Sequence, residues 1–203
     1  FKEKMGLKLI CAHINHNVRK ESDKEKEDLE KYCKKNNIIF EYIKIKKWGD
    51  DNFHNEARSI RYNFFEELIE NYDAKYLMTA HHGDDLIETI LMRIVRGSTL
   101  KGYSGFNRIV EKENYTIVRP LMTLTKDEII EFNENNNIEY AIDSSNLEDH
   151  YTRNRYRHTI LPFLKKEEIN VHKKFMKFSE TLLENNNYID KEAKKVFNDV
   201  FVN

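Results

Sequence analysis

The chain of 203 residues shows two periods in its hydrophobic positions, one typical of strands and one typical of helices. Short apolar or alternating runs predict strands, and apolar residues spaced three and four positions apart predict helices. The predicted strands cover residues 7–14, 38–45 and 75–80, and the predicted helices cover residues 21–36, 55–71 and 86–94. Strands that alternate with helices are typical of an α/β domain built on a mostly parallel sheet.

The C-terminal half of the chain is predicted to be mainly helical. A loop that contains glycines follows Arg96, and a further strand is predicted at residues 115–118. Thr125 and Glu128 have the spacing of a capping box, which predicts the start of another helix. The last predicted helix carries an amphipathic stripe formed by Ile189, Ala193, Val196, Phe197 and Val200. We therefore expect an α/β domain over residues 1–160 and a helical extension over residues 161–203.

Composition narrows the choice of partners. The chain has 34 Lys and Arg against 35 Asp and Glu, a formal net charge of −1. This balance excludes a globally basic nucleic-acid-binding protein and leaves room for a local basic surface. No apolar run approaches the roughly 18 residues of a membrane span, so no membrane partner is expected. Cys11 and Cys33 lack a Cys-x-x-Cys spacing, which favours reduced thiols in a cytoplasmic protein.

Polar residues follow two of the predicted strands, at the edge where parallel sheets bind ligands. The first strand leads to His13, Asn15 and His16. The third leads into a helix through two imidazoles and two carboxylates, which are His81, His82, Asp84 and Asp85. Such groups can hold a divalent ion, relay a proton or contact a phosphate, but an Asp at a helix start is also an ordinary cap. Two clusters at one sheet edge favour function, and zinc is disfavoured because no Cys joins the histidines.

A second polar stretch is basic. Arg153, Arg155 and Arg157 alternate with other residues, Tyr156 among them, and residues 145–174 hold seven Lys and Arg against four Asp and Glu. Guanidinium groups beside aromatic rings suit phosphate contacts and stacking on unpaired bases. Composition alone slightly favours the alternative, a solvated helix face whose arginines pair with the protein's own acidic residues.

An ordered set of motifs resembles the tRNA(Ile)-lysidine synthetase family of PP-loop ATP pyrophosphatases. The longest is the run from Thr79 to Arg93, which contains His81-His82-Gly83-Asp84-Asp85 and Glu88-Thr89 and is followed by Arg96-Gly97-Ser98. The others are His13-x-Asn15-His16, Glu56-Ala57-Arg58, Arg61-Tyr62, Arg119-Pro120-Leu121, Asp143-x-Ser145-Asn146 and Tyr151-Thr152-Arg153-Asn154-x-x-Arg157-His158. Each motif is weak alone, but together they follow the order of the family to about residue 165.

The resemblance implies a Rossmann-like PP-loop ATPase domain with a parallel sheet. It also implies a ligase that uses ATP and magnesium to adenylate the wobble cytidine of a tRNA(Ile) with the anticodon CAU. Free lysine would then displace AMP. The implied catalytic residues are His81 and Asp85, supported by His82 and Asp84; Arg58, Arg61, His13 and His16 would face the nucleotide; and Arg153, Asn154, Arg155, Arg157 and Asn146 would contact tRNA.

The chain departs from this family in its phosphate loop. The family carries a Ser-Gly-Gly-x-Asp-Ser loop after its first strand, and no such run occurs here. Residues 1–6 resemble the end of the helix after that loop, so we expect the first strand, the loop and the C-terminal tRNA-binding domains to be missing. Such a chain is expected to be inactive and not to bind ATP tightly. It is also expected either to be poorly stable or to pair strands 7–14 and 75–80, directly or with another molecule, as in a homodimer. Asn15 stands where the family often has Asp, so it is given no metal role.

Three alternative functions remain open on the sequence. A different PP-loop enzyme, such as a tRNA thiolase or an amide ligase, is disfavoured because sulfur transfer needs paired cysteines, and Cys11 and Cys33 fall in a predicted strand and a predicted helix. A non-catalytic remnant would keep only a tRNA-binding surface. A metal-dependent hydrolase would use His81, His82, Asp84 and Asp85 without tRNA or lysine.

Overall fold

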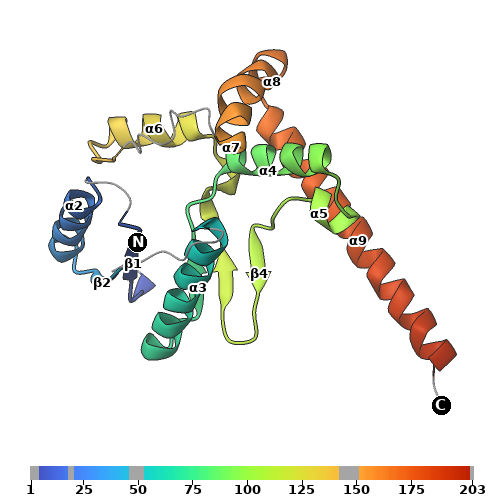
Figure 1. Ribbon diagram of the computed structural model, residues 1–203, viewed down its shortest axis with the longest axis horizontal. Coiled ribbons are helices and arrows are strands. Elements are labelled where there is room, and N and C mark those ends of the chain that lie inside the picture. Colours follow the sequence, from blue (N-terminus) through green and yellow to red (C-terminus); the bar gives the residue numbers. More distant parts are fainter. Residues whose placement is uncertain (1–4, 18–20, 46–52, 142–150, 202–203) are drawn as a thin grey trace. The chain divides into compact units, whose positions relative to one another are not determined.

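The computed structural model describes residues 5–17, 21–45, 53–141 and 151–201 (Figure 1). The chain divides into two compact units, Phe1–Leu77 and Met78–Asn203. Strands and helices alternate in the first unit, and helices dominate the second, so the predicted α/β class with a helical C-terminal part is confirmed. Within the described ranges, no helix is both long enough and apolar enough to cross a bilayer.

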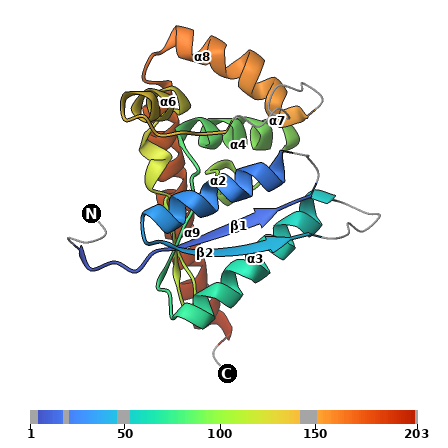
Figure 2. The same cartoon turned by 90° about the vertical axis from the view of Figure 1, so that its left-hand side faces the viewer.

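The first unit is built on two parallel strands. β1 (Ile10–Asn15) pairs with β2 (Ile39–Lys44), from Ile10 opposite Ile39 to Asn15 opposite Lys44. Helix α2 (Ser22–Lys35) connects them, and α3 (Phe53–Tyr72) follows β2 (Figure 2). A parallel pair needs a crossover of this kind, because the chain must return to the same end of the sheet.

Two details of β1 differ from the sequence prediction. The strand begins at Ile10 rather than at Leu7, whose side chain is 42% exposed. It was expected to be buried, yet every residue except Asn15 is only partly buried. Among the described residues β1 has one neighbouring strand, β2, which explains the incomplete cover.

A three-stranded sheet has the order β3-β5-β4. β3 covers Tyr76–Met78. The amide of Thr79, the residue after it, donates to the Val118 carbonyl of β5 (Thr116–Val118) at 3.0 Å. β4 (Ile109–Glu111) pairs with β5 in antiparallel fashion and was not predicted. This pair departs from the expected parallel arrangement.

The strands therefore lie in two separate sheets over the described part of the chain. The sequence predicted that β1 and β3 could pair directly. The residues that the structure describes do not contain this pairing, because β1 pairs with β2 and β3 pairs with β5. Pairing with another molecule stays a prediction.

Helix α4 (Gly83–Arg96) is the centre of the second unit. Its Leu86, Ile87 and Ile90 are fully buried and pack against Met122, Leu161 and Val171. The surrounding elements are α5 (Leu100–Tyr103), the 3₁₀ turn η1 (Pro120–Thr123), α6 (Lys126–Asn135), α7 (Thr152–Arg155), the π-helical turn η3 (Tyr156–Ile160), α8 (Leu161–Glu167) and α9 (Val171–Phe201).

The long helix α9 confirms the predicted C-terminal helix. Its first turns contribute Val171 and Phe175 to the core around α4. Farther along, the predicted stripe is exposed, with Ile189 at 54% and Val200 at 69%. The helical period therefore predicted the secondary structure correctly. It did not show that the start of α9 packs within this unit while the stripe near its end is exposed.

Candidate active site

The chain turns from β3 into α4 through the residues that the sequence singled out. Gly83 begins α4, and its amide donates to the Leu124 carbonyl at 2.8 Å. A Cβ at this position would lie 3.0 Å from that same oxygen and 3.3 Å from the Met122 carbonyl. A side chain here would press on two backbone carbonyls, so glycine favours the close approach of residues 122–124 to the start of α4.

Asp85 is held at this turn and still reaches solvent. The His82 amide donates to its Oδ2 at 3.1 Å, and His82 Nε2 lies 3.4 Å from the same oxygen. Its side chain is 15% exposed. A carboxylate at the third position of a helix that accepts from the N-cap amide forms half of a capping box, so its orientation is fixed by local geometry.

The neighbouring Asp84 is buried, and its carboxylate bonds groups on other helices. Its Oδ2 accepts from Lys165 Nζ at 2.9 Å and from the Lys126 amide at 3.2 Å. Lys165 also reaches Asp127 at 2.8 Å, so one ammonium joins α8 to the starts of α4 and α6. Asp84 and Asp85 thus have different partners, although they are adjacent in sequence.

Glu88 is a site residue to which sequence reasoning gave no role. Its side chain has no exposed surface, and two guanidinium groups satisfy it. Arg153 Nε lies 2.8 Å from Oε2, while Arg157 places Nε 2.8 Å from Oε1 and Nη2 3.1 Å from Oε2. The available signal was the three-residue spacing from Asp85, which places both carboxylates on one face of α4.

His81 lies between a hydroxyl and an aromatic ring. Its Nδ1 is 2.9 Å from Thr79 Oγ1, and its ring centroid is 5.1 Å from that of Phe106. The Arg119 guanidinium lies over the same Phe106 ring at 5.3 Å, a cation–π distance. Arg119 is buried and its Nη1 bonds the Asn107 carbonyl, so the Phe106 ring contacts both His81 and a fixed guanidinium.

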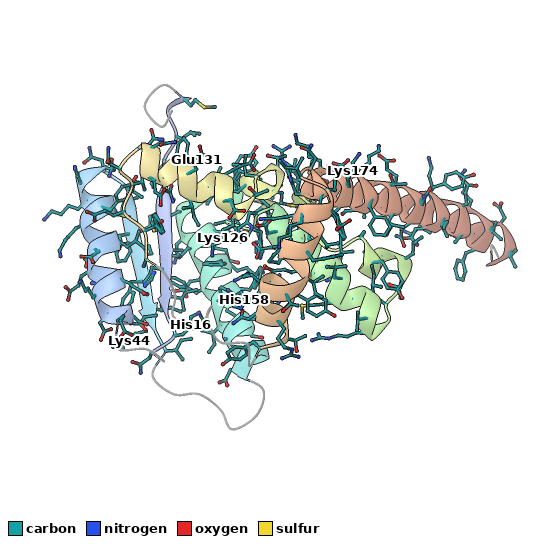
Figure 3. The ribbon with its side chains drawn as sticks, turned by 90° about the horizontal axis from the view of Figure 1, so that it is seen from above. His16, Lys44, Lys126, Glu131, His158 and Lys174 are labelled. Carbon is teal, nitrogen blue, oxygen red and sulfur yellow. The ribbon has the colours of Figure 1, made fainter. Side chains whose placement is uncertain are left out.

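The predicted nucleotide-facing residues belong to the first unit, and three of the four lie close together. His16, labelled in Figure 3, follows β1. Burial lowers the pKa of His16, and the nearby charges of Arg61 and His13 lower it further. The His13 ring stacks with Tyr42 at 5.9 Å and with Phe40 at 6.2 Å. Arg58 lies over the Tyr62 ring at 4.9 Å. The structure therefore brings His13, His16 and Arg61 together, and it gives His13 and Arg58 aromatic partners.

The predicted tRNA-contacting residues also separate. Arg153 and Arg157 turn toward Glu88, and Asn154 is buried. Arg155 is exposed and its Nη2 bonds Thr152 Oγ1 at 3.2 Å. Asn146 lies outside the described residues.

No group of three or more His, Cys, Asp or Glu side chains suited to a metal ion occurs among the residues that the structure places. The Asn15 amide is engaged in other contacts. Its Nδ2 donates to Asp23 Oδ1 at 2.7 Å and its Oδ1 accepts from the Asn17 amide at 2.7 Å. His81, His82, Asp84 and Asp85 do not form such a group among the described residues, and the metal-dependent hydrolase alternative stays a hypothesis.

Comparison with known proteins adds the family. The model of the PP-loop domain family, ATP_bind_3, matches residues 1–164. The tRNA(Ile)-lysidine synthase of Bacillus subtilis is 38% identical over 198 residues, and that of Bacillus cereus strain ATCC 14579 is 40% identical over 203 residues. These alignments cover 95% and 96% of this chain and 42% of each relative, so the chain spans less than half the length of either relative.

A solved structure shares the fold. The U34-tRNA thiolase NcsA from Methanococcus maripaludis, solved with its 4Fe-4S cluster, superposes with a TM-score of 0.72 and 16% sequence identity. The superposition covers 87% of this chain and 61% of the thiolase chain. At this identity the likeness establishes the fold alone.

Proposed function

Because this chain belongs to the PP-loop domain family, we propose that it supplies the catalytic domain of a tRNA(Ile)-lysidine synthase. The observation that carries the proposal is the identity of 38–41% over about 95% of the chain to proteins of that name. The proposed reaction joins free lysine to carbon 2 of the wobble cytidine in a cytoplasmic tRNA(Ile) with the anticodon CAU, using ATP.

The chemistry explains why such an enzyme needs ATP and a base. The cytidine carbonyl is a poor electrophile, and transfer of an adenylyl group to its oxygen, with release of pyrophosphate, makes that oxygen a good leaving group. The lysine amine then bonds to carbon 2, the carbon–oxygen bond breaks, and AMP departs. The amine must lose a proton during this step, and a nearby carboxylate or imidazole can accept it.

Asp85 is the carboxylate that best fits the role of proton acceptor. Of the three acids on the first turns of α4, Glu88 has no exposed side-chain surface, Asp84 has 4% and Asp85 has 15%. Its fixed Oδ2 and accessible side chain suit a group that meets an incoming ammonium. His81 is the second proposed catalytic group. His82 is proposed to orient Asp85, and the buried ion pair of Asp84 is proposed to anchor the turn.

His16 and Arg61 are the residues of the first unit best suited to a nucleotide phosphate. Both are basic and close enough for the charge of Arg61 to lower the pKa of His16, and an anion between them would relieve that repulsion. Magnesium is proposed to arrive with the nucleotide, since this ion keeps phosphate oxygens and waters as most of its ligands. No residue is assigned to it.

The test measures lysidine formation by the full-length protein that carries this chain. Labelled lysine should enter a tRNA(Ile) transcript with the anticodon CAU in an ATP-dependent manner, with one AMP released for each lysine joined. A transcript with an unrelated anticodon is the control. Equal ATP consumption with both transcripts would exclude the proposed substrate, and tRNA binding without turnover would favour a non-catalytic tRNA-binding protein.

A further inference from the structure

We propose that Arg157 is a positioning residue for the candidate active site. In this proposal Arg153 and Arg157 bind carboxylates of α4 and do not bind tRNA phosphates. The catalytic part of this inference rests on the function proposed above, because it concerns the orientation of Asp85. The structural part stands on the contacts of Glu88 alone.

Arg157 makes a two-point contact that fixes the Glu88 carboxylate. Its Nε lies 2.8 Å from Oε1 and its Nη2 lies 3.1 Å from Oε2, the paired geometry of a guanidinium and a carboxylate. Arg153 completes the site from the other side, with Nε 2.8 Å from Oε2. Glu88 has no exposed side-chain surface, so these bonds replace all of its contact with water.

The same two arginines extend to the proposed proton acceptor and its helical turn. Arg157 Nη2 lies 3.5 Å from Asp85 Oδ1, and Arg153 Nη2 lies 2.9 Å from Thr89 Oγ1 and 3.4 Å from the Asp85 carbonyl. Two cations therefore face two anions, Glu88 and Asp85. Burial would lower the pKa of Arg157, but its bonds and charge interactions with Glu88 and with the two aspartates raise it overall. Arg157 is thus a permanent cation of this cluster.

Helical spacing explains how the segment after residue 150 reaches α4. Arg153 and Arg157 are four residues apart on consecutive helical turns, α7 and the π-helical turn η3, so they share a face. Asp85 and Glu88 are three residues apart on α4 and share a face as well. The two faces meet over four charged side chains, and this docking sets the orientation of both carboxylates.

This arrangement is incompatible with a simple phosphate contact by Arg157. The side chain is only 19% exposed, and both of its inward nitrogens bond the buried Glu88. Turning it toward tRNA would leave a buried carboxylate without its paired donor, which is strongly unfavourable. Lysine cannot replace it, because one ammonium cannot reproduce the planar two-point contact.

The experiment compares Arg157→Lys with Arg108→Lys in the full-length protein. Arg108 has an exposed side chain on the loop before β4 and serves as a matched control. For Arg157→Lys we expect kcat for lysidine formation to fall on the order of 10- to 100-fold, since a small misplacement of a reacting group has effects of this size. The Kd for tRNA and its dependence on salt should remain those of the wild type, and Arg108→Lys should change none of these.

A phosphate contact predicts the opposite pattern. If Arg157→Lys or Arg157→Gln weakens tRNA binding, flattens the salt dependence by about one unit of slope and leaves kcat at saturating tRNA unchanged, Arg157 binds tRNA and the proposal is wrong.

The structural half is tested without any assay of activity. Thermal melts of Glu88→Gln, Arg157→Gln and the double variant form a cycle in which the double variant should lose less stability than the two single losses combined. Additive losses would overturn the contact itself. If the wild-type protein forms no lysidine, the proposed function is wrong, but the result of the stability cycle still stands.

Discussion

Asp84 and Asp85 show what a sequence motif conveys at the scale of single residues and what it omits. The sequence placed both at a strand-to-helix turn, and the family resemblance implied a catalytic role for Asp85 and a supporting one for Asp84. In the structure Asp84 bonds Lys165, 81 residues away in the chain, and Asp85 bonds the amide of His82. Local spacing predicts a capping contact of the second kind. It carries no information about a partner on α8, so only the fold separates the buried aspartate from the accessible one.

Asp85→Asn should abolish lysidine formation and leave the fold intact. An amide keeps an oxygen that accepts from the His82 amide, but it has neither the negative charge nor the basicity to take a proton from lysine. Activity and thermal melts of the full-length protein measure both parts. Asp28→Asn is the control, since Asp28 is exposed on α2 and forms a surface ion pair with Lys31 at 3.3 Å. Activity near the wild-type level would return Asp85 to a purely structural role.

His16 should titrate below the ordinary value of 6.5, because burial and the charges of Arg61 and His13 lower its pKa. As the pH falls through 6.5, the unfolded chain takes up this proton before the folded chain does. The stability linked to His16 is therefore present above pH 6.5 and is lost as the pH falls toward the folded-state pKa. An NMR titration of the histidine ring protons measures this directly.

Arg61→Gln tests the cause of that shift. Removing the cation should raise the pKa of His16 toward 6.5, and Arg58→Gln should have a smaller effect because Arg58 lies over the Tyr62 ring. An unchanged His16 pKa in Arg61→Gln would separate the two residues and remove the basis for a shared phosphate site.

At the scale of elements, the sequence predicted the helices and strands that show a hydrophobic period or a capping motif. The helix after Thr125 is confirmed with its capping box. Glu128 Oε2 accepts from the Thr125 amide at 2.6 Å, and the Glu128 amide donates to Thr125 Oγ1 at 3.2 Å. The sequence missed β4, α5 and the π-helical turn η3. The first two have three and four residues, barely more than one period of a strand or a helix, so no repeat can reveal them, and the π turn depends on packing.

Lys165→Met should lower the melting temperature by several degrees. The substitution removes a cation that joins α8 to Asp84 on α4 and to Asp127 on α6. The buried Asp84 carboxylate keeps its hydrogen bond from the Lys126 amide but loses its ion pair. Since Lys165 is 26% exposed, the loss should be about 1–3 kcal/mol, below the roughly 3–5 kcal/mol of a fully buried pair. Lys166→Met, on the exposed side of the same helix, is the control. Equal melting temperatures for the two variants would show that the contact contributes nothing.

At the scale of the whole molecule, the family and the α/β class followed from the order of the motifs, but the assembly of the site did not. The two arginines that meet Glu88 come from positions 65 and 69 residues later in the chain. Their spacing showed that they share a face and left open which surface that face meets. The sequence interpretation assigned them to tRNA, whereas the structure directs them to α4. Contacts at such separations are set by tertiary packing, which no local pattern encodes.

The chain of 203 residues should bind ATP with a Kd no lower than about 1 mM, equivalent to a binding free energy of roughly −4 kcal/mol. A triphosphate needs several backbone N–H groups that converge at the start of a helix. The start of α4 is unsuitable, because the Gly83 amide donates to Leu124 and two aspartates follow it. The glycines with positive φ in the second unit, Gly97 and Gly105, come after that helix and not after a strand.

Isothermal titration calorimetry of the chain with ATP and magnesium measures this affinity, and a titration with AMP shows how much the phosphates add. We expect little difference between the two nucleotides, because His16 and Arg61 offer only a small basic site. ATP binding at micromolar Kd that greatly exceeds AMP binding would mean that these 203 residues contain a triphosphate site of another design. The next step would then be to repeat the titration with Arg61→Gln, since this variant retains tight binding only if that site lies elsewhere.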